Sequence, residues 1–116
     1  MKSVNINEII TIAKLKKMSE KMFGDYVKAV IDLSKNIMVI DAHMHADEEL
    51  FLLENGSEQG NLWGINLYPN NFGTDKWIEF DSMINLRPSW GNKSRGVDEP
   101  KIQQQIINLV NKLVQQ

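Results

Sequence analysis

The sequence predicts an α+β fold of two layers, with a largely antiparallel sheet of about five strands and about three helices on one face. Short runs that are rich in β-branched residues, or that alternate in polarity, are typical of strands. Three other segments carry apolar residues at helical spacing. With 116 residues and neither an internal repeat nor a low-complexity linker, the chain is expected to form a single domain over residues 1–116.

The N-terminal segment predicts one strand followed by one helix. Apolar and polar residues alternate over 3–8, as they do in a half-buried strand. Thr11 is a favourable N-cap for a helix over 12–23, which carries one apolar stripe and ends at Gly24.

The next segment predicts a hairpin and a short helix. Residues 26–33 and 37–40 are rich in β-branched side chains, and the polar residues 34–36 between them are typical of a tight turn. Residues 47–53 predict a helix, because acidic residues stand at its positive end and Gly56 follows it. A strand over the same residues is the alternative.

The C-terminal half predicts two more strands, a long loop and a last helix. The strands span 62–68 and 77–86, and the loop covers 87–98. Asp98 is expected to cap the last helix, with Pro100 in its first turn. The apolar stripe of that helix would serve the core, or else a homodimer.

The composition excludes several classes of protein. The chain carries 13 Lys and Arg against 15 Asp and Glu, so its net charge of −2 predicts no general attraction to nucleic acid or to anionic membranes. It has no Cys, which excludes disulfides, thiolate catalysis, iron–sulfur clusters and Cys-type zinc sites. No apolar run approaches the roughly 20 residues of a membrane span, and no signal-peptide pattern is found, so we expect a cytoplasmic protein.

His43 and His45 form a His-x-His segment that resembles a strand end of amidohydrolase metalloenzymes, where two imidazoles about 6.6 Å apart bind one divalent ion. That superfamily uses a barrel of about 250 residues. This chain has 116 residues and two His, so any metal would need nearby carboxylates to complete its shell. The alternative is a polar strand end before an acid-capped helix. We assign no metal ligand and leave the cofactor open.

The loop over 87–98 is the first candidate site. It combines hydrogen-bond donors with two glycines, and such a loop can surround a phosphate or a carboxylate, because Arg binds oxyanions bidentately and glycines let N–H groups converge. It lacks the glycine patterns of nucleotide-binding loops. The alternative is a solvated connection that neutralises nearby acids. The candidate ligand-binding residues are Asn85, Arg87, Asn92, Ser94 and Arg95.

A second candidate site combines carboxylates with a histidine. Glu79, Asp81 and Asn85 share one face of the expected strand. Arg87 continues that face, which suits either acid–base catalysis or a polar surface crossed by ion pairs. His45 titrates near neutral pH when it is unperturbed, so it suits a catalytic or a ligand-binding role. The candidate catalytic residues are His45, Asp47, Glu48 and Asp81.

Several strings of residues resemble a known family. They span 23–25, 27–30, 45–49, 56–57, 62–69, 77–85, 87–88, 91–92 and 94–95, and the string Trp-Gly-Ile-Asn-Leu-Tyr-Pro over 63–69 is the most specific. On these residues the chain resembles a family of short bacterial and archaeal conserved hypothetical proteins, catalogued as a domain of unknown function. The family pattern has His at the position of His45 but not at that of His43, which favours His45 beside the acids over a His-x-His metal site. The resemblance implies no activity and no functional residue.

Three functions are open from the sequence. The first is binding of a polar or anionic small ligand between a strand end, at Asp81, Asn85 and Arg87, and the loop over Asn92–Arg95. The second is a small hydrolase that uses His45 and nearby carboxylates, with or without a divalent metal. The third is a protein-interaction or dimerisation module. Trp63 and Trp90 could stack on bases, but the basic residues are few, so we expect neither nucleic acid nor a membrane as a partner.

Overall fold

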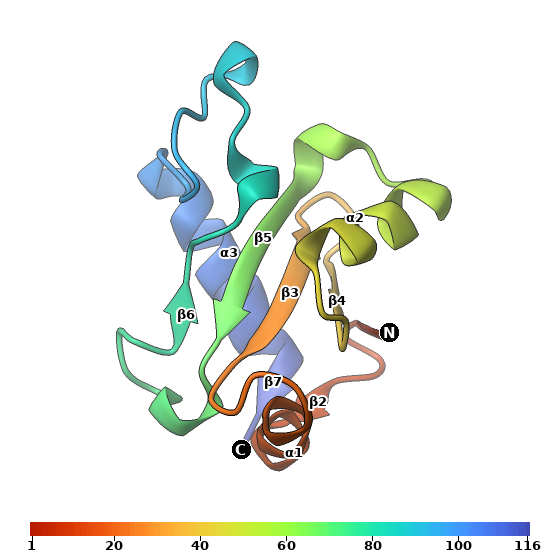
Figure 1. Ribbon diagram of the computed structural model, residues 1–116, viewed down its shortest axis with the longest axis vertical. Coiled ribbons are helices and arrows are strands. Elements are labelled where there is room, and N and C mark those ends of the chain that lie inside the picture. The colour runs from red at the N-terminus through yellow and green to blue at the C-terminus, as the bar shows by residue number, and fades with distance from the viewer.

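The computed structural model describes residues 1–116, and a five-stranded sheet forms its centre (Figure 1). The strands lie in the order β1-β4-β3-β5-β6, and every neighbouring pair is antiparallel. The strands are β1 (Lys2–Val4), β3 (Val27–Asp32), β4 (Ile37–Ile40), β5 (Leu62–Leu67) and β6 (Ile78–Glu79). The predicted α+β class and its antiparallel sheet of about five strands are confirmed.

Three helices and one short strand pair complete the fold. The helices are α1 (Ile12–Lys21), α2 (His45–Glu54) and α3 (Pro100–Leu113). The parallel pair consists of β2 (Ile10–Thr11) and β7 (Val114–Gln115), which the sequence does not predict because two residues show no periodicity. Short 3-10 turns lie in the connections: η1 (Gln59–Asn61), η2 (Pro69–Asn71), η3 (Met83–Asn85) and η4 (Pro88–Trp90). None of the helices has the length and the apolar character that a membrane span requires.

The helices cover both faces of the sheet, with α2 in front of it and α3 behind it (Figure 1). Ala29 and Ile31 of β3 belong to the main core, to which α1 and α3 contribute. The alternate residue Val30 packs with Val39 and with Leu52 of α2 in a second core on the opposite face. The expected placement of the helices on one face is therefore wrong. The reason lies in the centre of β3, where Ala29, Val30 and Ile31 are apolar and point alternately to the two faces, so that the strand is buried on both of them.

Local hydrogen bonds cap helix α1 and form the turn between β3 and β4. The Thr11 hydroxyl accepts a hydrogen bond from the Lys14 N–H at 3.2 Å and caps α1, as predicted. In the turn between β3 and β4, the Asp32 carboxylate accepts hydrogen bonds from the N–H groups of Ser34 and Lys35, at 2.8 and 3.0 Å. The predicted hairpin is confirmed.

Helix α3 has a different cap from the predicted one. Glu99 is its N-cap and Pro100 is its first residue. The Asp98 carboxylate instead accepts hydrogen bonds from the Lys93 N–H and the Ser94 hydroxyl in the preceding loop. A short acidic side chain can accept hydrogen bonds either from the first N–H groups of a helix or from donors in the preceding loop, and in this protein Asp98 binds the loop donors.

The strand predicted over 77–86 ends after Glu79. Beyond this point the chain leaves the sheet, and Ser82 packs directly on Gly64 of β5. This packing needs a glycine, because a Cβ at Gly64 would lie 2.6 Å from the Cβ of Ser82. Asn85 therefore does not continue the face that carries Glu79, and that part of the prediction is wrong.

Helix α2 lies over only part of its face of the sheet (Figure 1). Its ribbon does not extend over the lower ends of β3 and β5 or over β6, and we call this the open part of the face. Strand pairing places Lys28 opposite Asn66, and Asn66 opposite Glu79, in one row across β3, β5 and β6. Because alternate residues of a strand share a face, Lys28 lies on the same face as Val30, which packs against α2. We call Lys28, Asn66 and Glu79 the polar row.

Candidate functional site

Asn85 completes the edge of strand β5. Its side chain is fully buried, and its Nδ2 donates to the carbonyl oxygens of Gly64 and Arg95, both at 2.9 Å. Its Oδ1 accepts from the Gly64 N–H at 2.8 Å. The amide thus pairs with β5 as the backbone of a further strand would, and neither N–H remains for a ligand.

Asn92 holds its loop closed. Its Nδ2 lies 2.7, 3.1 and 2.9 Å from the carbonyl oxygens of Asn85, Ser94 and Gly96. Its Oδ1 accepts from the Asp98 N–H at 2.9 Å, and the Ser94 hydroxyl donates to the Asp98 carboxylate. These polar groups of the predicted ligand loop therefore satisfy one another.

Arg87 lies inside the molecule and does not continue a strand face. Its side chain is 9% exposed, and its terminal nitrogens donate to the carbonyl oxygens of Gln59 and Leu62 at 2.5 and 2.8 Å. The guanidinium carbon lies 4.4 Å from the ring centroid of Trp63 and 5.8 Å from that of Trp90. All three side chains line a cavity of about 460 Å³. Arg87 thus ties the start of β5 to the loop that follows it.

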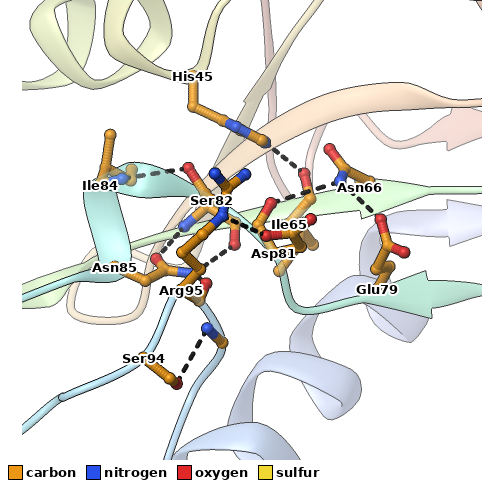
Figure 2. A network of polar contacts seen from close by, with 12 residues as sticks. His45, Ile65, Asn66, Glu79, Asp81, Ser82, Ile84, Asn85, Ser94 and Arg95 are labelled. Carbon is orange, nitrogen blue, oxygen red and sulfur yellow. Dashed lines mark hydrogen bonds and ion pairs between the residues drawn. The ribbon is translucent and has the colours of Figure 1, made fainter.

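His45 reaches the open part of the sheet from the first turn of α2 (Figure 2). Its Nε2 lies 2.8 Å from the carbonyl oxygen of Ile65, and because a carbonyl only accepts, Nε2 carries the proton. Nδ1 is the remaining acceptor of the ring and has no protein partner. Burial lowers the pKa of His45, and the bond to Ile65 opposes this effect without reversing it. The imidazole is therefore neutral at pH 7.

Asp81 and Arg95 form an ion pair beside His45. The Nε of Arg95 donates to Asp81 Oδ1 at 2.7 Å, and both side chains are about half exposed. The terminal nitrogens of Arg95 bind no protein group, and they lie on the His45 side of the pair (Figure 2). The charges of Asp81, Arg95 and Lys28 all act on the pKa of His45. The structure thus brings one residue of the predicted ligand loop together with two of the predicted catalytic residues.

The polar row adds Lys28 and Asn66, to which the sequence does not point. Asn66 Nδ2 donates to Glu79 Oε1 at 2.8 Å, and the Tyr68 hydroxyl donates to the same oxygen at 3.3 Å. Lys28 forms no ion pair, and its Nζ lies 5.2 Å from the ring centroid of Phe23. The one signal in the sequence is that each residue stands between apolar neighbours, Lys28 after Val27 and Asn66 after Ile65.

The remaining predicted catalytic residues lie apart from this group. The Glu48 side chain is fully buried, and neither carboxyl oxygen has a hydrogen-bond partner. Burial raises the pKa of Glu48 to about 10, and the nearby backbone of Ala42, which favours the charged form, opposes this effect without reversing it. The group is therefore neutral at pH 7. Asp47 is exposed and lines a separate cavity beside His43. No three His, Asp or Glu side chains converge in the way that metal ligands do.

A family model described as a protein of unknown function (DUF5674) matches residues 4–113 of the chain. The matched range includes His45, Asp81, Arg95 and the polar row. No curated protein and no solved structure matches the chain.

Proposed function

Because the chain belongs to the DUF5674 family of proteins of unknown function, we propose its function from its own residues. The domain binds a small anionic ligand on the open part of the sheet face, between His45, Lys28 and Arg95. A carboxylate or a phosphate is the chemical group that suits these side chains. An anionic small molecule is also the ligand class that the sequence suggests. Of the three binding residues proposed here, only Arg95 belongs to the loop that the sequence predicts as the binding site.

Two cationic side chains whose terminal nitrogens have no protein acceptor carry this proposal. Only the Nε of Arg95 is engaged, by Asp81, so its terminal nitrogens can bind two oxygens of one anion. Lys28 has no acid within ion-pair distance, and its ammonium adds a point charge. Neutral His45 lies near both cations, and its Nδ1 suits a protonated oxygen of the ligand.

The ion pair of Asp81 and Arg95 supports the same reading. A half-exposed pair of this kind contributes only about 0–1 kcal/mol to stability, so the fold gains little from it. Its main physical effect is to hold the guanidinium in one orientation. The fold has a clear need for three other predicted residues. The hydrogen bonds of Asn85, Arg87 and Asn92 to buried backbone groups explain their presence without a ligand.

Acid–base catalysis by His45 is a second candidate function. The observation in its favour is the fixed tautomer, because the bond from Nε2 to the Ile65 carbonyl leaves Nδ1 as a base at neutral pH. Nδ1 would accept the proton of a water molecule whose oxygen bonds to the acyl carbon or the phosphorus of the bound ligand, and Asp81 would stabilise the resulting imidazolium. The bond to the leaving alcohol oxygen would then break, and the imidazolium would return its proton to that oxygen. In this case His45→Gln should abolish hydrolysis of a nitrophenyl ester or phosphate and retain anion binding.

Titration with inorganic phosphate, acetate and citrate tests the binding function by calorimetry and by thermal shift. An anion at 100 times its Kd should add about 2.7 kcal/mol and raise the melting temperature by several degrees. Arg95→Gln should abolish this shift. The matched control Lys93→Gln changes an exposed residue of the same loop and should keep it. A shift that Arg95→Gln leaves unchanged, or no shift with any of the three anions, would reject the site.

The proposal extends to the partner and the location. The net charge of −2 favours a small molecule over nucleic acid. The apolar stripe of α3, including Ile106 and Leu113, is buried in the main core, so we do not propose a homodimer through it. The absence of cysteine fits a reducing compartment, and we therefore place the activity in the cytoplasm.

A further inference from the structure

We propose that the anionic ligand is a phosphorylated sugar, whose ring lies against Tyr26 and Tyr68 and whose hydroxyl donates a hydrogen bond to Glu79. This inference rests on the proposed function, because Arg95 and Lys28 would hold the phosphate. The additional residues offer groups that a simple inorganic anion has no means of using.

Glu79 is an oriented acceptor without a cation. Its Oε1 receives hydrogen bonds from Asn66 Nδ2 at 2.8 Å and from the Tyr68 hydroxyl at 3.3 Å. Its side chain is exposed, and no Lys or Arg lies within ion-pair distance of it. The two bonds on Oε1 hold the carboxylate in place and leave Oε2 free. A carboxylate oxygen in this state favours a hydroxyl donor, because hydrogen bonds to charged acceptors are stronger than those to neutral ones.

The polar row carries a positive charge at one end, on Lys28, and a negative charge at the other, on Glu79. Lys28 and Glu79 lie on either side of Asn66, and adjacent strands are about 4.8 Å apart, so the row spans about 10 Å. An ion as small as phosphate cannot contact both ends at once. A sugar phosphate carries an anion at one end and hydroxyl donors at the other, and therefore matches the order of charges along the row.

An aromatic cluster borders the polar row where β3 begins and β5 ends. The ring centroids of Tyr26 and Tyr68 are 5.3 Å apart, and Phe23 stacks on Tyr26 at 4.7 Å. All three rings are partly exposed. Tyr26 lies between Phe23 and Tyr68, so the apolar area for the C–H face of a sugar or for a base comes from the face of Tyr68 that Tyr26 does not cover and from the exposed ring edges. Aromatic side chains with a few oriented polar groups are typical of small-molecule sites.

Calorimetric titration with inorganic phosphate, ribose 5-phosphate and adenosine 5′-monophosphate tests this inference. Ribose 5-phosphate should bind about tenfold more tightly than phosphate, because one hydrogen bond to a charged acceptor contributes at least that factor. Glu79→Gln should reduce the advantage to about twofold and leave phosphate binding unchanged. Gln keeps an acceptor for Asn66 but can place a donor where the ligand hydroxyl donates. The control Glu20→Gln, at an exposed position of α1, should change neither affinity.

The outcomes separate the two proposals. If adenosine monophosphate binds more tightly than ribose 5-phosphate, the inference holds and the natural ligand is a nucleotide. If ribose 5-phosphate binds more tightly than phosphate and at least as tightly as adenosine monophosphate, the inference holds and the natural ligand is a free sugar phosphate. Equal affinity for phosphate and ribose 5-phosphate, or an advantage that Glu79→Gln preserves, overturns the inference and leaves the anion site standing. No binding of any probe, or binding that Arg95→Gln does not weaken, overturns the proposed function itself.

Circular dichroism establishes that Glu79→Gln is folded before it is titrated. If that variant does not fold, Tyr68→Leu provides the same comparison, because it removes both the aromatic ring and the hydroxyl that holds Glu79. Tyr68→Leu should weaken ribose 5-phosphate binding and spare phosphate binding. Equal weakening of both ligands would overturn the inference.

Discussion

Glu48 should make the protein less stable as the pH rises. Its carboxyl is fully buried without a hydrogen-bond partner, and burial raises its pKa from 4.5 to about 10. Between these two values the folded chain keeps a proton that the unfolded chain has released. The stability associated with this group is therefore full below pH 4.5, and it falls by about 1.4 kcal/mol for each pH unit up to about pH 10.

Glu48→Gln should remove this pH dependence, because Gln has nearly the same shape and no charge to lose. At pH 7, which is about 2.5 units above the ordinary value, the variant should gain up to about 3 kcal/mol in free energy of unfolding. At pH 4.5 it should differ little from the natural chain. In a chain of 116 residues, the gain at pH 7 corresponds to a rise in melting temperature on the order of 10 °C.

Urea unfolding followed by tryptophan fluorescence, at about pH 4.5, 6 and 7.5, measures these differences. The matched control Glu54→Gln changes an exposed residue at the end of the same helix and should retain the natural pH dependence. A loss of stability in Glu48→Gln at the highest pH would refute the reasoning. It would mean that the carboxylate is ionised in the folded chain and paired, with Lys28 as the cation whose charge acts on it.

Two further predictions concern Arg87 and His45. Arg87→Ala should lower the free energy of unfolding by about 2–4 kcal/mol in chemical denaturation, because the carbonyls of Gln59 and Leu62 lose their donors; an unchanged midpoint would contradict the structural role of this residue. His45 should titrate below pH 6.5 when it is followed by NMR, because burial lowers its pKa. The folded chain then binds this proton less readily than the unfolded chain. In the Glu48→Gln variant, the stability that neutral His45 contributes should therefore be lost as the pH falls below 6.5. Titration of His45 at or above pH 6.5 would contradict the lowering of its pKa by burial.

Local signals are sufficient to predict most secondary structure in this chain. The β-branched runs over 26–33 and 37–40 form strands, and the polar turn between them reverses the chain as expected. Thr11 caps the first helix. These features depend on the preferences of a few neighbouring residues, which the sequence displays directly.

The candidate site is only partly predictable. His45, Asp81 and Arg95 are among the predicted site residues, but their proximity depends on how α2 lies on the sheet. Asn85 and Asn92 have the side chains of ligand-binding residues as well, yet they bind backbone groups of the protein itself. A polar side chain in a loop does not indicate whether its partner will be a ligand or a distant peptide group.

The sequence by itself determined the α+β class, the hairpin and the extents of most helices and strands, because periodicity and turn chemistry act over a few residues. Only the tertiary structure decided that α2 covers the face opposite to α3 and that strand register places Lys28, Asn66 and Glu79 in one row across three strands. It also decided which polar groups stay free, because the bonds of His45 to Ile65 and of Asn85 to Gly64 join residues 20 and 21 positions apart. Contacts over such separations depend on packing and strand register, which no local pattern encodes.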